Sequence, residues 1–128
     1  VSKLKKFIKK LNNHKIKTSL FIDPNLKNIK ISKILNVKCV EFHTGKISRI
    51  IKTNKNFNKE LKNIIKCTNY ANSLGIEVHA GHGIDYKTAK ILSKIRLIKE
   101  FNIGHFIIGE SIFYGLKNII KIFKKICK

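Results

Sequence analysis

The fold is decided by the stretch Ile76-Glu77-Val78-His79-Ala80-Gly81-His82-Gly83, in which a strand-forming apolar run ends in two glycines around a histidine. Its composition predicts a strand over 76–80. Asp85 follows at a position suited to cap a helix, and the apolar residues from Ala89 to Ile95 give that helix one buried side. A strand followed directly by a helix is the repeating unit of an α/β protein.

The same order of strand and helix recurs on both sides of this stretch. Further strands are predicted over 18–23, 38–42 and 101–108, and further helices over 4–11, 24–35, 58–74 and 112–123. Asp23-Pro24 is expected to open the helix over 24–35, as N-cap and first helical residue. Four strand-helix units after one leading helix predict a parallel sheet with helices outside. No linker or short repeat divides residues 1–128, so no internal domain boundary is expected.

The charge is unusual, with 28 Lys and Arg against 7 Asp and Glu in 128 residues, a formal net charge of +21. The 43% of hydrophobic residues suffices for a core and excludes wholesale disorder. Only Arg49 and Arg96 are arginines, the type best suited to recognising phosphates and bases. Lys, Ile and Asn are abundant and have AT-rich codons, so codon bias explains the charge better than a nucleic-acid partner, which stays the weaker alternative.

Location and thiol chemistry follow from what the chain contains. Lysines interrupt every apolar run before it reaches the roughly 20 residues of a membrane span. The N-terminus shows no secretory signal pattern, so we expect a cytoplasmic location and no membrane partner. Cys39, Cys67 and Cys127 have neither zinc-site spacing nor an even number for disulfides, and buried free thiols are expected.

Histidines gather near the carboxyl ends of the predicted strands, where active sites of parallel α/β proteins lie. Four lie in or just beyond these strands, namely His43, His79, His82 and His105. His14 falls in a helix-to-strand connection and is interpreted as a surface residue. The four histidines and Glu41 have the donor atoms of a metal site, but their spacing matches no metal motif, so no metal is expected.

Strand alternation places Glu41 and His43 on one side of the sheet and Val40 and Phe42 on the other. For Glu41, a buried ion pair and a catalytic or polarising role both remain open. The glycines beside His82 allow close approach of a ligand, so its imidazole is a candidate general acid or base. Backbone N–H groups after Asn102-Ile103-Gly104-His105 predict an anion cradle and hence a phosphorylated substrate.

Five ordered motifs resemble the C-terminal half of the pyridoxine 5'-phosphate synthase family. They are Ser19-Leu20-Phe21-Ile22-Asp23, Glu41-Phe42-His43-Thr44-Gly45, Ser73-Leu74-Gly75, Ala80-Gly81-His82-Gly83 and Asn102-Ile103-Gly104-His105-Phe106-Ile107-Ile108-Gly109. The resemblance implies a TIM barrel of which residues 1–128 supply about strands 5 to 8. It also implies a ring-closing, transferase-type condensation of 3-amino-2-oxopropyl phosphate with 1-deoxy-D-xylulose 5-phosphate. The products are pyridoxine 5'-phosphate, phosphate and water, in vitamin B6 biosynthesis, without a cofactor and in a homo-octamer.

The resemblance also implies residue roles. His82 is expected to be the proton donor and Glu41 the transition-state stabiliser. The residues expected to bind 3-amino-2-oxopropyl phosphate are His82, Gly83, Gly104 and His105. No role for His43 carries over. The chain departs from the family pattern at Thr18, His79 and Glu110, and the Glu110 carboxylate is expected to weaken anion binding because a basic residue is usual there.

The family's remaining catalytic His and Glu and its arginines for the pentulose phosphate belong to an N-terminal half that this sequence lacks. We therefore expect a half-barrel, beginning without Met at a cut edge, that is inactive until it pairs with the other half. A non-catalytic remnant or structural partner of the same fold is the alternative. The retained His82 and Glu41 argue against it.

Overall fold

Four parallel strands form one sheet in the spatial order β1-β2-β3-β4, in the computed structural model of residues 2–127. The strands are β1 Ser19–Ile22, β2 Cys39–His43, β3 Glu77–Gly81 and β4 Ile98–Asn102. Each strand pairs in parallel with the next one along the chain, and a bulge between Val78 and His79 interrupts the register of β3 with β4. The predicted α/β class with a parallel sheet is confirmed.

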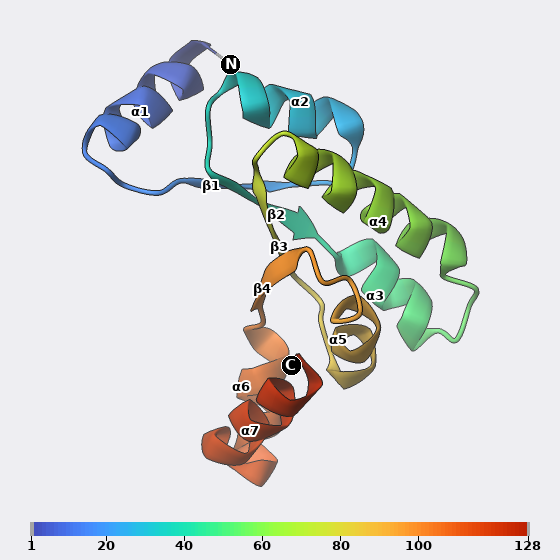
Figure 1. Cartoon of the computed structure of the whole chain (residues 1–128). Coiled ribbons are helices and arrows are strands. Elements are labelled where there is room, and N and C mark those ends of the chain that lie inside the picture. Colours follow the sequence, from blue (N-terminus) through green and yellow to red (C-terminus); the bar gives the residue numbers. More distant parts are fainter. Residues whose placement is uncertain (1, 128) are drawn as a thin grey trace.

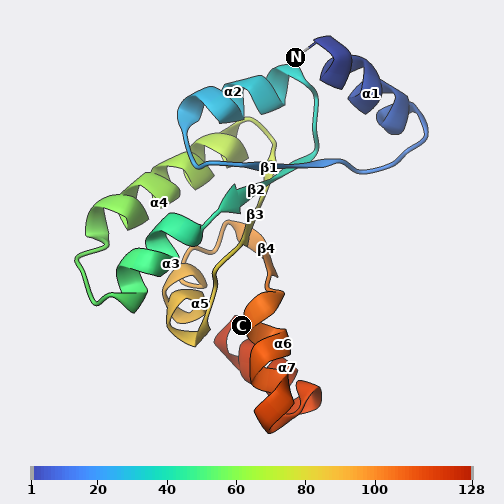
Figure 2. The same ribbon diagram turned by 180° about the vertical axis from the view of Figure 1, so that it is seen from behind.

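Helices connect the strands and cover one side of the sheet. Within residues 2–127 they are α1 Ser2–Asn13, α2 Leu26–Ile34, α3 Gly45–Lys52, α4 Asn58–Ser73, α5 Tyr86–Leu92, α6 His105–Tyr114 and α7 Leu116–Ile126. Helices α2 to α5 lie along the same side, while α6 and α7 pack together beyond β4 (Figures 1 and 2). Across these residues, every helix falls short of the length and apolarity that crossing a membrane requires.

The alternation predicted for β2 is confirmed. Val40 and Phe42 are fully buried on the helix side, whereas Glu41 and His43 are half-buried on the other side. Phe21 of β1 pairs in register with Glu41, and its side chain is 57% exposed. The side of the sheet that carries Glu41 is therefore open, and we call it the open face.

The strand expected over 101–108 is wrong in both bounds, because β4 begins at Ile98 and shares only Phe101 and Asn102 with the prediction. Strand β4 ends at Asn102, and the chain becomes helical from His105. The run is rich in isoleucine, which suggests a strand, but Ile103, Phe106 and Ile107 also have the i, i+3, i+4 spacing of a helix. These three side chains pack against the core in the structure, so tertiary packing selects the helix.

Two other helical expectations need correction. The helix predicted over 112–123 is two helices, because Gly115 has φ +78° and ψ 137° and breaks the path between α6 and α7. Helix α3 follows directly after β2 in a region where no element was predicted. It buries Ile47, Ser48 and Ile51 on one side, a stripe too short to stand out from sequence alone.

The caps show one correct and one wrong prediction. The Asp85 carboxylate accepts a hydrogen bond from the Thr88 N–H at 2.8 Å, as expected for the N-cap of α5. Helix α2 is capped by Asn25, whose side-chain oxygen accepts from the Asn28 N–H at 2.8 Å, rather than by Asp23. Pro24 restricts the residue before it to extended conformations, so the chain turns into the helix only after the proline.

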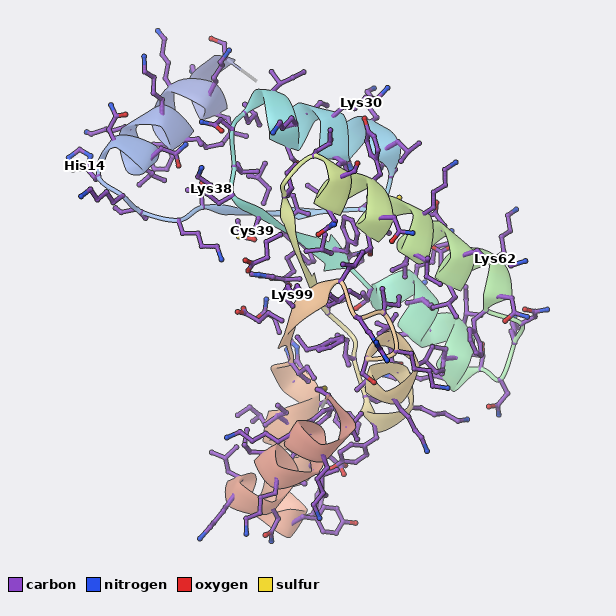
Figure 3. The ribbon with its side chains drawn as sticks, in the orientation of Figure 1. His14, Lys30, Lys38, Cys39, Lys62 and Lys99 are labelled. Carbon is purple, nitrogen blue, oxygen red and sulfur yellow. The ribbon has the colours of Figure 1, made fainter. Side chains whose placement is uncertain are left out.

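The positions of the surface lysines, of His14 and of the cysteines agree with the sequence analysis. Lys30 on α2 and Lys62 on α4 are exposed and project outward from their helices, and His14 is an exposed residue at the turn after α1 (Figure 3). The cysteines are free thiols, buried at Cys39 and Cys67 and half-buried at Cys127.

Candidate active site

A concave pocket of about 840 Å³ lies at the carboxyl ends of the strands, beside α6. All five residues proposed as site residues line it, namely Glu41, His82, Gly83, Gly104 and His105. They come from β2, from the loop after β3 and from the start of α6, so the parallel sheet brings together groups that are far apart in the sequence. His43 contacts this set through the ring of His82, with the two ring centroids 4.7 Å apart.

Glu41 is held across three strands. Its Oε2 accepts a hydrogen bond from the Asn102 side-chain amide of β4 at 2.8 Å. A Cβ built on Gly81 of β3 would overlap the Glu41 carboxylate, so only glycine leaves room for it there. Within the described residues Glu41 makes no ion pair, so a neutral amide rather than a buried cation is its partner. The sequence analysis included Asn102 in a motif but missed its pairing with Glu41, although strand alternation places both residues on the same face.

His82 lies on a tight turn directly after β3. Its φ is +76° and that of Gly83 is +75°, so two consecutive residues adopt left-handed backbone. Such a conformation costs a non-glycine residue about 1–3 kcal/mol and persists only where the surroundings impose it. His82 is exposed and lines the pocket.

The first turn of α6 forms the opposite wall. Gly104 is its N-cap and offers no side-chain cap, and the first N–H groups of a helix have no partner within the helix. Gly104, His105 and Phe106 all line the pocket. Exposed N–H groups and a helix N-terminus favour a bound anion, and the anion cradle at this place stays a prediction.

Glu110 lines the same pocket. Two other side chains bear on its negative charge, Tyr86 and Lys52, and the sequence analysis gave neither of them a role. Burial, followed by the negative charge of Glu110, raises the pKa of the Tyr86 phenol. Lys52, at the end of α3, also lines the pocket and supplies a positive charge. It was missed because the whole of α3 was missed.

His79 of β3 pairs in register with Glu41 but does not line the pocket. It is 6% exposed, and its Nε2 lies 2.7 Å from Glu77 Oε1 within β3. Hydrogen bonds from His79 and then from Lys17 lower the pKa of Glu77 to about 2. Glu100 approaches the other ring nitrogen of His79 at 3.7 Å. Over residues 2–127 no three His, Cys, Asp or Glu side chains gather to hold a metal ion.

The fold and the pocket together define a class: a parallel α/β protein whose strand ends hold a carboxylate, an imidazole and a helix N-terminus around one cavity. Comparison with known proteins makes this specific. The model of the family described as "Pyridoxal phosphate biosynthesis protein PdxJ" matches residues 1–128, and the chain belongs to this family.

Curated relatives agree, and each is called "Pyridoxine 5'-phosphate synthase". The protein of Pelagibacter ubique (strain HTCC1062) is 63% identical over 124 residues, which are 97% of this chain and 52% of the relative. That of Wolbachia sp. subsp. Drosophila simulans (strain wRi) is 42% identical, over 96% of this chain and 51% of the relative. That of Sulfurihydrogenibium sp. (strain YO3AOP1) is 41% identical, over 96% and 50%. The chain spans about half the length of these relatives.

Proposed function

We propose that this chain supplies half of a pyridoxine 5'-phosphate synthase. The enzyme condenses 3-amino-2-oxopropyl phosphate with 1-deoxy-D-xylulose 5-phosphate and releases pyridoxine 5'-phosphate, phosphate and water. One observation carries the proposal: the family motifs around Glu41, His82 and Gly104 meet at a single pocket, beside a helix N-terminus that suits a phosphate. The names of the relatives support the same activity.

A closed barrel is part of this proposal. Eight parallel strands with their helices need about 250 residues. Residues 2–127 form four strands with an open face and with edges at β1 and β4 that are unpaired among these residues, and the chain matches about half of each relative. Residues 1–128 then form one continuous half-domain, which other strands complete before turnover is possible. Small phosphorylated ligands are the proposed substrates, while the homo-octamer and the cytoplasmic location stay predictions.

In the proposed reaction each residue has a distinct task. Glu41, held by Asn102, stabilises positive charge that develops on an iminium-like nitrogen. His82 donates a proton to a departing hydroxyl or phosphate. His82, Gly83, Gly104, His105 and the first turn of α6 hold the phosphate of 3-amino-2-oxopropyl phosphate. Lys52 offsets the charge of Glu110, and no cofactor or metal takes part.

The test joins this chain to the part of the Pelagibacter relative that the match does not cover. We expect the chimera to form pyridoxine 5'-phosphate from the two phosphates, measured by chromatography. His82→Ala should lower turnover by at least about 100-fold, the scale of a general acid, and Glu41→Gln by about 100-fold. The matched control is His14→Ala, because His14 is exposed and does not line the pocket.

Two results would contradict the proposal separately. A chimera that folds, as judged by circular dichroism, and makes no product contradicts the activity. Full turnover in the His82→Ala chimera contradicts the role of His82 but leaves the reaction in place.

A further inference from the structure

We infer that Thr44 and His43, at the end of β2, are positioning residues that hold His82 in its working geometry. The Thr44 side chain is fully buried, and its hydroxyl lies 2.8 Å from the Gly81 carbonyl and 2.9 Å from the His82 carbonyl. A hydroxyl has a single hydrogen, so it is shared between these two acceptors. The Thr44 backbone N–H also donates to the Gly81 carbonyl at 2.8 Å.

The Thr44 hydroxyl bonds to the turn that carries His82 and not to its own helix. Thr44 is the N-cap of α3, where a threonine oxygen normally accepts a hydrogen bond from an N–H of the first turn. Here the side chain makes no such bond and instead donates to the turn after β3. The threonine thus gives up helix capping and restrains the left-handed backbone at His82. A buried donor in this place offsets the cost of that conformation.

His43 restrains the other end of His82, its ring. The two imidazoles lie with centroids 4.7 Å apart and planes tilted by 41°. On its other side the His43 ring meets Phe21 edge to face at 5.2 Å, and His43 Nδ1 lies 3.5 Å from Asp23 Oδ1. These contacts fix the position of His43, and a fixed ring is a firm surface for its neighbour.

Gly45 provides the space for both rings. A Cβ at this position would lie 2.9 Å from His82 Cδ2 and 3.0 Å from His43 Nε2. The three residues His43, Thr44 and Gly45 therefore each contact the turn or ring of His82 in a different way. The catalytic meaning of this arrangement rests on the proposed function, in which His82 donates a proton. The contacts that these three residues make with His82 do not depend on the proposed function.

The test reads the geometry directly by NMR in the 128-residue chain. Because Gly45 lies against His82 Cδ2, the unmodified chain should show a nuclear Overhauser effect between His82 Hδ2 and the Gly45 Hα protons. Thr44→Val removes the hydroxyl at nearly constant volume, and we expect loss of most of this signal. Thr44→Ser keeps the hydroxyl and should restore it. Thr68→Val is the matched control, because the Thr68 hydroxyl is buried without a hydrogen-bond partner among the described residues.

A second pair of variants examines the ring contact. His43→Ala should lose the same signal, and His43→Phe, which keeps a planar ring, should retain it. The inference is overturned if Thr44→Val and His43→Ala both keep the full signal, or if Thr68→Val weakens it as much as Thr44→Val does. Should Thr44→Val fail to fold, the His43 pair decides alone. No turnover is needed, so failure of this inference and failure of the proposed reaction are separate results.

Discussion

Single residues at the strand ends decide where the reactive groups lie. Gly81 leaves the space that the Glu41 carboxylate occupies, and Asn102 fixes one of its oxygens. Thr44 restrains the turn that carries His82. None of these three supporting residues has a proposed chemical step of its own. They resemble the supporting groups that keep an active site preorganised.

A second cluster, away from the pocket, predicts a dependence of stability on pH. Folding lowers the pKa of Glu77 from 4.5 to about 2, because His79 and Lys17 donate hydrogen bonds to its carboxylate. The resulting stabilisation is fully present above pH 4.5 and is lost as the pH falls toward about 2. We expect Glu77→Gln to lower stability at neutral pH and to flatten the decrease in acid.

Urea unfolding at several pH values measures this effect as a free energy of unfolding. The Glu77 side chain is 40% exposed, so the effect should be small and should weaken with added salt. Glu100→Gln serves as the control, because its carboxylate lies 3.7 Å from His79 and should contribute less. An identical pH profile in wild type and Glu77→Gln would contradict the prediction.

Helices and strands were predictable from the sequence where the helix caps and the spacing of apolar residues indicate the same element. The strands over 18–23, 38–42 and 76–80 were predictable, because short apolar runs end at turn-forming or polar residues. The fourth strand and α6 were not predictable, because the isoleucine-rich run over 101–108 fits both the alternation of a strand and the i, i+3, i+4 spacing of a helix. Contacts of Ile103 and Phe106 with the core decide between them, and those contacts depend on chain segments far away in the sequence.

The start of α2 provides a prediction at this scale. Asn25→Ala should cost about 1 kcal/mol of folding free energy, because it removes the side-chain acceptor of the Asn28 N–H. Asp23→Ala should cost less, since its carboxylate is 74% exposed and does not cap the helix. Asp85→Ala, at the cap of α5, should resemble Asn25→Ala. Urea unfolding of the three variants measures the costs, and a larger loss from Asp23→Ala than from Asn25→Ala would contradict the assignment.

At the scale of the whole molecule, large apolar side chains of α6 are exposed. Ile112 and Phe113 of α6 are 78% and 80% exposed, and the edges of β1 and β4 are unpaired within the described residues. Exposed apolar patches and free strand edges promote association. The net charge of +21 opposes it through repulsion that salt screens.

We therefore predict that the isolated chain self-associates, and more strongly as salt is added. Sedimentation velocity over a range of protein concentrations measures this. Ile112→Lys combined with Phe113→Lys should lower the association. Ile34→Lys, which changes an exposed isoleucine on α2 away from α6, should leave it unchanged. A monomer at every concentration and salt level would contradict the prediction.

The α/β class, most strand positions, the family resemblance and the five candidate site residues were predictable from the amino-acid sequence alone. These follow from periodicity, glycine placement and ordered motifs, which are properties of neighbouring residues along the chain. The folded structure was needed to show that Asn102 bonds to Glu41, that Thr44 bonds to the turn of His82, and that Lys52 lines the pocket while His79 does not. The physical reason is that these contacts join different strands and helices, so they exist only once the parallel sheet has brought those segments together.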